Sequence, residues 1–379
     1  MGMVGGGRAA FIGSVHRMAA ALDGQIELVC GAFSSDPLRS RQSGEDLYLD
    51  PKRCYESFDE MFRTEATLED DVRMDMVSIV TPNHLHFAPA MMALDFGFHV
   101  ICDKPLCLTV KEAETLAAKA KSSGLIFAVT HAYAAYPMIR QARQMIAHAA
   151  LGKIRRVVVE YPQGWLSTPL ESEHQKQAAW RTDPEKSGVA GAMGDIGTHA
   201  AQLAEYVSGL RITELCADLH THVAGRRLDD DGSVLLRFNN GARGVLYASQ
   251  ISAGEENNLR IRVYGESGSV EWAQMEPNSL IVRWLDQPMQ VYRTGVGKLY
   301  PETIAHTRVP SGHPEGYIEA FANIYRNVAY CIQARLSGEQ VDPLYEDYPG
   351  IDNGVRGMKF IEAVLKSNLT EEKWTSLTD

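Results

Sequence analysis

The sequence predicts an α/β protein of two domains, in which a doubly wound parallel sheet precedes an α+β domain with a large, mostly antiparallel sheet. Three observations carry this prediction. The chain has 379 residues, and domains of about 150 residues each make two the expected number. Residues 1–132 alternate short apolar runs with amphipathic stretches, as βαβ units do. Residues 133–379 contain strands that follow one another across tight turns, as in an antiparallel sheet.

The first domain is expected to contain five strands, at residues 1–4, 26–33, 76–80, 99–102 and 126–130. Helices are expected between them, from the glycine cluster to residue 22, at 85–97 and at 109–123. Thr109 and Glu112 stand at the spacing of a capping box, and Gly124 is a helix terminator, so the last helix has a signal at both ends.

The second domain opens with alternating strands at residues 154–161 and 212–222. Asn239, Asn240 and Gly241 give the signal of a hairpin between two further strands. Helices are expected at 196–207, 316–335 and 351–365, and we expect the last of them to pack back on the first domain.

Composition and charge argue against several classes of protein. With 45% hydrophobic and 22% charged residues, the chain is typical of a globular protein and not of a disordered or collagen-like one. A net charge of −11 argues against a nucleic-acid partner. No apolar run is long enough for a membrane span. Six scattered cysteines without a CxxC pair, and the absence of an export signal, predict a cytoplasmic protein.

A glycine turn stands at the end of the first strand. Gly5, Gly7 and Ala10 match the G-x-G-x-x-A spacing and open a helix, where backbone amides approach a pyrophosphate. Together with the βαβ pattern, this turn predicts a dinucleotide cofactor.

The end of the second strand bears on the choice of dinucleotide. An acid usually binds the adenosine ribose there, but this chain has Ser34 and Ser35, followed by Arg39. A missing acid and a nearby arginine tolerate a 2′-phosphate, so NAD and NADP both stay open.

Two pairs of histidines stand close together in the sequence, and the first pair resembles a metal site. His84 and His86 lie in the turn after strand 76–80, but no third ligand stands at a usual spacing. We interpret this turn instead as part of the sheet's carboxyl edge, where a nicotinamide would lie. His220 and His222 share one face of a strand and are interpreted as structural. No metal is therefore expected.

Lys104 and a distant Asp/His pair are the residues best placed for chemistry. Asp103 and Lys104 follow strand 99–102 directly, at the carboxyl edge where such folds bind ligands. Asp195 and His199 lie four residues apart at the start of a helix, so both side chains point to one side. A histidine accepts a proton near neutral pH, and a neighbouring carboxylate stabilises its cation.

Together these motifs resemble the Gfo/Idh/MocA family of sugar and polyol oxidoreductases over essentially the whole chain. The markers are the glycine turn, the Asp-Lys-Pro tripeptide 103–105, the Asp-x-x-x-His helix start 195–199 and the Trp-Arg segment 180–184. The chain departs from the family at Asp103, where glutamate is usual, and at Ser34, where many members have an acid. The resemblance implies an N-terminal Rossmann fold and an NAD- or NADP-dependent dehydrogenase.

The resemblance also implies the catalytic residues Lys104, Asp195 and His199, acting on a secondary alcohol of a sugar, inositol or related polyol. His199 would take the hydroxyl proton, and Lys104 would stabilise the negative charge that develops on oxygen. Asp195 would orient the substrate and tune His199. Family members divide the acid–base work between the lysine and the histidine differently, so these two roles stay open.

The predicted cofactor contacts are Gly5, Gly7, Ala10, Phe11, Ser34, Ser35, Arg39, Thr81, Pro82, Asn83, His86, Asp103, Lys104, Trp180 and Arg181. The long polar and aromatic segment 161–180 is expected to be either a lid or specificity loop, or a surface or oligomer-contact loop. The predicted substrate contacts are Lys104, Tyr133, Tyr136, Gln163, Trp165, Arg181, Asp195, His199 and His313.

Two other functions stay open. A redox glycosidase on the same fold would oxidise the sugar transiently, eliminate the aglycone and return the hydride. A non-catalytic dinucleotide sensor would not need the catalytic trio, which this chain retains. A homodimer or homotetramer is expected, because relatives in the family pair the open faces of their antiparallel sheets.

Overall fold

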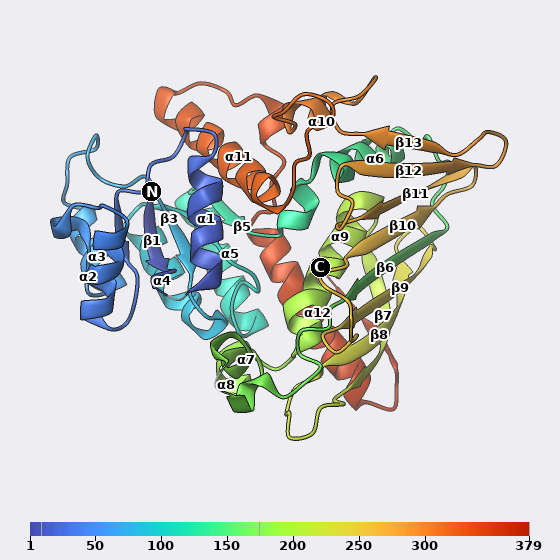
Figure 1. Ribbon diagram of the computed structural model, residues 1–379, viewed down its shortest axis with the longest axis horizontal. Coiled ribbons are helices and arrows are strands. Elements are labelled where there is room, and N and C mark those ends of the chain that lie inside the picture. The colour runs from blue at the N-terminus through green and yellow to red at the C-terminus, as the bar shows by residue number, and fades with distance from the viewer. Residues whose placement is uncertain (9, 174, 379) are drawn as a thin grey trace. The chain divides into compact units, whose positions relative to one another are not determined.

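The computed structural model of the chain describes residues 1–8, 10–173 and 175–378. Its contacts divide into two compact units, shown in Figure 1. The first unit comprises Met1–Thr130 and Tyr317–Val355, and the second comprises His131–Gly316 and Arg356–Asp379. The two continuous domains expected from the sequence stay a prediction.

The first unit contains a five-stranded parallel sheet with the order β2-β1-β3-β4-β5. Its strands are β1 (Gly2–Gly5), β2 (Cys30–Ala32), β3 (Met76–Val80), β4 (His99–Cys102) and β5 (Phe127–Val129). Met3 of β1 pairs with Gly31 on one side and Ser78 on the other, so the order of the strands changes direction at β1. This confirms the predicted doubly wound sheet.

The helices of the first unit are α1 (Phe11–Ala21), α2 (Pro37–Asp46), α3 (Phe58–Glu65), α4 (Phe87–Asp95), α5 (Val110–Ser123) and α11 (Tyr317–Ser337). Both predicted ends of helix α5 are confirmed. Thr109 and Glu112 form a capping box, and Gly124 follows the helix at a φ angle of +68°. Helix α3 was not predicted, although Ser57 caps it. Helix α11 packs against α1.

The second unit is built on a nine-stranded sheet with the order β13-β12-β11-β10-β6-β9-β8-β7-β14. The strands are β6 (Arg156–Pro162), β7 (Ile212–His220), β8 (Asp231–Phe238), β9 (Arg243–Ser249), β10 (Arg260–Tyr264), β11 (Gly268–Ala273), β12 (Ser279–Trp284), β13 (Gln290–Arg293) and β14 (Trp374–Ser376). All neighbours run antiparallel except β6 and β9. The predicted mostly antiparallel sheet is confirmed.

The parallel pair β6–β9 brings distant loops to one edge of this sheet. Strands β6 and β9 end side by side, with Pro162 opposite Ser249. The antiparallel neighbour β10 begins at the same edge, with Arg260 opposite Glu160. The segments after β6, after β9 and before β10 are therefore neighbours, although up to about a hundred residues separate them along the chain.

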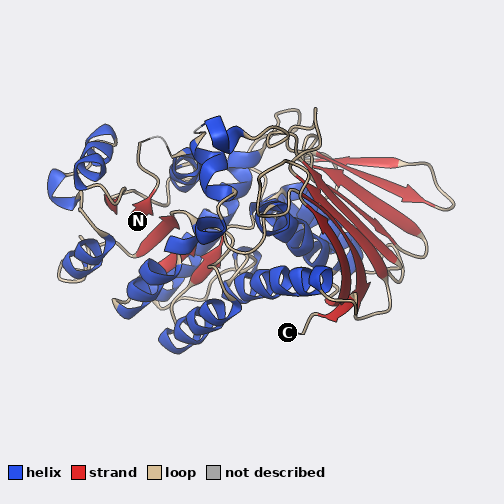
Figure 2. Cartoon of the chain, turned by 90° about the horizontal axis from the view of Figure 1, so that it is seen from below, coloured by secondary structure: helices blue, strands red, loops and turns tan. Residues whose placement is uncertain are grey.

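Helices cover one face of the nine-stranded sheet, as Figure 2 shows. The helices of this unit are α6 (Pro137–Ala147), α7 (Lys176–Arg181), α8 (Pro184–Ser187), α9 (Thr198–Ser208), α10 (Pro301–Ala305) and most of α12 (Ile351–Leu369). Strand side chains alternate accordingly: Val234 and Leu236 of β8 are buried, whereas Leu235 between them is 50% exposed.

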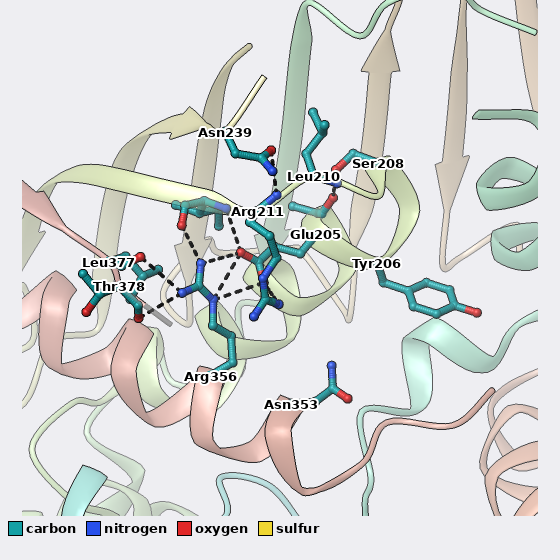
Figure 3. Close-up of polar contacts among 12 residues, drawn as sticks. Glu205, Tyr206, Ser208, Leu210, Arg211, Asn239, Asn353, Arg356, Leu377 and Thr378 are labelled. Atoms are coloured by element: carbon teal, nitrogen blue, oxygen red, sulfur yellow. Dashed lines mark hydrogen bonds and ion pairs between the residues drawn. The ribbon is translucent and has the colours of Figure 1, made fainter. Parts of the chain in front are cut away.

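Figure 3 shows how α12 is tied into the second unit by Arg356, which is buried. Its guanidinium donates to the Glu205 carboxylate of α9 at 2.7 Å and to the carbonyl oxygens of Leu377 and Thr378 at 3.3 Å. Glu205 also accepts the backbone N–H of Ile212, where β7 begins, at 2.7 Å. One buried ion pair thus joins α9, α12 and the chain after β14. The expected packing of this helix on the first domain stays a prediction.

Candidate active site

The glycine turn joins β1 to α1. Gly5 and Gly6 have φ angles of +81° and +73°, a conformation that favours glycine. The Gly7 N–H donates to the Phe33 carbonyl at 3.2 Å, which fixes the turn to the chain after β2. Ala10, the N-cap of α1, provides no side-chain cap, so none of its atoms competes with an anion for the first amides of the helix. This arrangement fits a pyrophosphate.

A glycine outside the motif also shapes the turn. A β-carbon on Gly13 would lie 2.3 Å from the Cα of Gly6, so α1 packs directly on the turn. The sequence motif names Ala10 as its third small residue, whereas the closest contact between helix and turn is at Gly13. Phe11, the first residue of α1, is 62% exposed.

The chain after β2 presents hydroxyl groups and an arginine. The Ser34 hydroxyl accepts the Asp36 N–H at 3.1 Å, and the Asp36 carboxylate caps α2 by accepting the Arg39 N–H at 3.0 Å. Ser35 and the Arg39 side chain are exposed. One carboxylate oxygen of Asp36 is thus engaged in capping α2.

The turn after β3 holds Thr81, Pro82 and Asn83 at the carboxyl edge of the parallel sheet. His86 follows them and is buried. Its two ring nitrogens lie 2.8 Å from the Thr81 carbonyl oxygen and 2.9 Å from that of Pro105. His86 therefore ties the turn after β3 to the turn after β4. Its predicted contact with the cofactor stays a prediction.

Asp103 fixes the backbone on which Lys104 stands. Its carboxylate accepts the Lys104 N–H at 2.8 Å and the Thr130 hydroxyl at 2.7 Å, and so joins the ends of β4 and β5. Burial by itself raises the pKa of Asp103, but the charged forms of His16 and Lys104 and the Thr130 hydrogen bond outweigh it. The pKa of Asp103 therefore lies below its ordinary value.

A buried polar cluster near Asp103 is not indicated by any sequence motif. The Nδ1 atom of His16, on α1, lies 2.7 Å from the Tyr325 hydroxyl of α11. The Ser78 hydroxyl of β3 lies 2.7 Å from the same oxygen. Burial lowers the pKa of His16 to about 4, so its imidazole is neutral near pH 7.

Asp195 and His199 stand on either side of a change in helix type. Residues Met193–Gly197 form a π-helical turn, and α9 begins directly after it at Thr198. The sequence predicts an ordinary helix start, in which residues four apart share one face. A π turn is wider, and such turns often mark functional sites in helices.

The donors to the Asp195 carboxylate include a guanidinium and an amide. The carboxylate accepts from Arg181 Nε at 3.3 Å and from Gln250 Nε2 at 2.9 Å. The Arg181 guanidinium lies over the ring of Trp180 at 4.2 Å and that of Trp165 at 5.9 Å. Four predicted site residues thus form one cluster. Gln250, which follows β9 and is buried, was missed because no local motif indicates it.

Asp229 supports the segment that carries Asp195. Its two carboxylate oxygens accept the N–H groups of Gly191 and Met193, each at 2.7 Å. Burial raises the pKa of Asp229, and the charge of Asp230 raises it further, against the effect of these two bonds. No sequence signal connects Asp229 to a site nearly forty residues earlier.

His199 is buried among aromatic rings. Its ring centroid lies 4.9 Å from that of Tyr133, 5.4 Å from that of His131 and 6.5 Å from that of Tyr161. The first two contacts are edge-to-face. Tyr133 is a predicted site residue, whereas His131 and Tyr161 are additions from the structure.

Two other predicted substrate contacts have different surroundings. Tyr136 is 1% exposed, and its ring packs at 5.1 Å on that of Trp272 in the core of the second unit. His313 is exposed, with Nδ1 3.1 Å from the Pro310 carbonyl oxygen. Their roles as substrate contacts stay predictions.

The described part of the chain holds no group of three or more His, Cys, Asp or Glu side chains that could bind a metal ion. His220 and His222 contact each other, with ring centroids 4.3 Å apart. Among the same described residues, none of the helices combines the length and the apolar character that crossing a membrane requires.

The chain matches two family models in succession. Residues 1–131 match the oxidoreductase family with an NAD-binding Rossmann fold, and residues 139–271 match the GFO/IDH/MocA C-terminal domain. The uncharacterized oxidoreductase YfiI of Bacillus subtilis (strain 168) is 35% identical over 375 residues, which are 98% of this chain and 95% of that protein.

Solved structures agree with this assignment. An oxidoreductase from Sinorhizobium meliloti is 45% identical, covers 98% of both chains and superposes with a TM-score of 0.89. An inositol dehydrogenase homolog from Azotobacter vinelandii, complexed with NAD+, is 39% identical over 99% of this chain and 96% of that one, with a TM-score of 0.93. Its complex with NADH and myo-inositol shows 38% identity over the same shares, with a TM-score of 0.90. The chain is therefore a member of the Gfo/Idh/MocA family of oxidoreductases, with an NAD-binding Rossmann domain at its N-terminus.

Proposed function

We propose that the protein oxidises a secondary alcohol of a cyclic polyol or sugar, with NAD or NADP as hydride acceptor. The observation that carries the proposal is the cluster of Asp195, Arg181 and two tryptophan rings beside the π turn that leads into the His199 helix. Aromatic faces with a few fixed polar groups are how proteins orient sugars and polyols. The glycine turn of the first unit supports the proposal that a dinucleotide is the cofactor.

The residue roles follow from what the reaction requires. A proton leaves the hydroxyl group and a hydride leaves the carbon that bears it. The nicotinamide, when bound, supplies the hydride acceptor. We assign His199 as the base that takes the proton, because imidazole accepts protons near neutral pH. Asp195, held by Arg181 and Gln250, orients the neighbouring hydroxyl groups.

Lys104 is assigned to the reacting oxygen, whose developing negative charge its ammonium would stabilise. This assignment is supported by the family resemblance and by the position of Lys104 after β4, on a backbone that Asp103 and Thr130 fix. Separate variants of Lys104 and His199 distinguish their shares of the acid–base work.

The proposed substrate class is a cyclic polyol such as myo-inositol. Support comes from the Azotobacter vinelandii homolog, whose structure contains NADH and myo-inositol. The exposed Arg39 and the hydroxyl groups after β2 support either NAD or NADP, and the cofactor preference is part of the test.

The test begins with thermal unfolding in the presence of NAD, NADH, NADP and NADPH, since a ligand that binds only the native state raises the melting temperature. The best cofactor is then combined with a panel of polyols and sugars, including myo-inositol, and its reduction is followed by absorbance. We expect a cyclic polyol to be oxidised and Lys104→Ala to lose the activity. Full activity in Lys104→Ala would remove the mechanism, and aglycone release without net cofactor reduction would indicate a redox glycosidase instead.

A homodimer or homotetramer in the cytoplasm completes the proposal. The sheet face that carries Leu235 also carries the cross-strand ion pairs Arg237–Glu214 and Arg262–Glu160, a mixture suited to a self-complementary surface. All six cysteines are free thiols, which suits a reducing compartment. Sedimentation of the wild type and of Leu235→Arg tests the assembly, and a wild type that is monomeric at micromolar concentration would exclude it.

A further inference from the structure

Three side chains near His199 form a closed ring of hydrogen bonds. The Tyr161 hydroxyl lies 2.8 Å from Asn257 Oδ1, Asn257 Nδ2 lies 3.1 Å from the Tyr133 hydroxyl, and the two hydroxyl groups contact each other. Two further residues attach to this ring. Gln163 Nε2 lies 2.6 Å from Asn257 Oδ1, and Trp165 Nε1 lies 3.0 Å from Gln163 Oε1.

The indole of Trp165 determines the direction of every bond in this group. An indole nitrogen only donates, so the atom that faces it is the oxygen of Gln163. The nitrogen of Gln163 therefore faces Asn257 and requires the oxygen of Asn257 as its acceptor. That leaves the Asn257 nitrogen to donate to Tyr133.

The remaining protons can then be placed. Tyr161 donates its hydroxyl proton to Asn257 Oδ1, because a carbonyl oxygen only accepts. The bond between the two hydroxyl groups consequently uses the proton of Tyr133. Each member of the ring donates once within it, an arrangement in which hydrogen bonds polarise and strengthen one another. Burial raises the pKa of Tyr133, and the Asp195 charge adds to this effect, which keeps that proton in place at neutral pH.

Both phenol protons are therefore used in hydrogen bonds within the ring. These bonds fix the two tyrosine side chains beside His199, whose ring centroid lies 4.9 Å from that of Tyr133 and 6.5 Å from that of Tyr161. Gln163 uses one of its two amide hydrogens on Asn257. Among the residues that the structure describes, its second N–H has no acceptor, so it can donate in a fixed orientation to a hydroxyl or carbonyl oxygen of a substrate.

We propose that Asn257 is a positioning residue for the reaction, which fixes the two tyrosine rings against His199 and fixes Gln163 as a hydrogen-bond donor to the substrate. The inference rests on the function proposed above, because it gives His199 and Gln163 their roles. The sheet explains how Asn257 reaches this place: it lies before β10, at the edge where β6 leads into Gln163 and Trp165.

The first test uses Asn257→Leu and Asn257→Asp. The leucine variant removes the ring and keeps the number and branching of the side-chain heavy atoms, and we expect kcat/KM to fall about 10- to 100-fold, mainly in kcat, as misplacement of a reacting group does. The cofactor-induced rise in melting temperature should persist, because the glycine turn is untouched.

The aspartate variant cannot donate to Tyr133, so the ring cannot close, and it brings a negative charge toward His199. Titratable groups that contact His199 include His131, Tyr133 and Tyr161, and Asp195 lies four residues before it, in the π turn. An added carboxylate stabilises the protonated imidazole, so the acidic limb of the kcat/KM profile should move to higher pH.

Asn258→Leu is the matched control. Asn258 is the adjacent residue and is buried, and it bonds to Glu255 at 2.8 Å and to Arg260 at 2.8 Å without touching the ring. We expect this variant to lower the melting temperature while the pH limb stays in place.

The second test is independent of activity. In tyrosine-labelled protein, the hydroxyl protons of Tyr133 and Tyr161 should give NMR signals protected from exchange in the wild type and in Asn258→Leu, and not in Asn257→Leu. Protected signals in a wild type that oxidises no polyol would overturn the proposed function, and with it the role of Asn257. Unchanged kinetics of Asn257→Leu in an active enzyme, or a wild type without protected signals, would overturn the role of Asn257 alone.

Discussion

Asp103 in the first unit and Asp229 in the second both fix a backbone segment that carries a residue assigned to the reaction, but their pKa values are shifted in opposite directions. Each carboxylate is largely removed from water and accepts backbone N–H groups beside a residue that we assign to the reaction. Asp103 binds the N–H of Lys104 itself, at 2.8 Å. Asp229 binds two N–H groups of the segment that leads to Asp195, each at 2.7 Å.

Their pKa values move in opposite directions because their surroundings differ. Burial tends to raise both, but His16 and Lys104 in their charged forms bring the pKa of Asp103 below its ordinary value. The Asp229 carboxylate is bound by the amides of Gly191 and Met193 and lies near the like charge of Asp230, so burial leaves its pKa raised. At Asp229 the backbone amides do not offset the loss of hydration, whereas at Asp103 the nearby cations and the Thr130 hydrogen bond do.

The largest effect is expected from Asp229→Ala. The substitution leaves the buried N–H groups of Gly191 and Met193 without their acceptors, and we expect the free energy of unfolding to fall by about 2–4 kcal/mol. Because this segment carries Asp195, kcat/KM should fall roughly 100-fold. Urea denaturation and steady-state kinetics measure the two effects. Asp218→Ala, at an exposed site on β7, should change neither, and an Asp229→Ala enzyme with normal kinetics would show that the segment holds its shape unaided.

Asp103→Asn should have a smaller effect, chiefly on activity. It keeps the volume and an acceptor for the Lys104 N–H but removes the charge that pairs with the lysine, so we expect kcat/KM to fall roughly ten-fold. Asp103→Glu restores the charge that is usual in the family and should keep most of the activity. Equal activity of the two variants would show that the carboxylate acts through its shape and not through its charge.

Much of the fold is predictable from local patterns. The five parallel strands follow from apolar runs separated by helical stretches, and α5 is defined by Thr109, Glu112 and Gly124. The π turn at Met193–Gly197 is not predictable in this way, because a glycine-rich segment has no pattern that distinguishes it from an ordinary helix start. Helix α3 has local signals of the same kind, because Ser57 caps it and Met61 and Phe62 lie together on its buried face, so it too is predictable from the sequence although we did not predict it.

Some residues of the candidate site are likewise predictable from local motifs, and others are not. Lys104, Asp195 and His199 lie in short motifs and are visible in the sequence. Gln250 and Asn257 are single polar residues in loops, and they reach Asp195 and Gln163 only because β6, β9 and β10 are neighbours in the sheet. Strand order is a property of long-range pairing, so no local signal identifies such residues.

Thr130→Val sharpens the comparison within the first unit. It removes one hydrogen bond to the ionised Asp103 and leaves the Lys104 N–H bond in place, so we expect a loss of about 1.5 kcal/mol in the free energy of unfolding. Thr130→Ser keeps the hydroxyl and should recover most of this loss in the same denaturation experiment. A Thr130→Val protein as stable as the wild type would show that this hydrogen bond to Asp103 contributes nothing to the free energy of unfolding.

The smallest effect is expected at acidic pH, where the contributions of Asp103 and Asp229 to the free energy of unfolding change with pH in opposite directions. The pKa of Asp103 is lowered on folding, so its stabilisation is present above the unfolded value near 3.9 and is lost as pH falls through the folded value. The pKa of Asp229 is raised, so ionisation opposes folding and its contribution declines as pH rises from about 4 toward the folded value. Between pH 3 and 6, the destabilisation by Asp103→Asn should therefore grow with pH, and the destabilisation by Asp229→Asn should shrink. Burial lowers the pKa of His16 to about 4, so His16 also changes its charge within this pH range. The wild type and Asp103→Asn are therefore compared again in a His16→Gln background. Parallel slopes for the two substitutions would mean that the cations near Asp103 do not outweigh its burial.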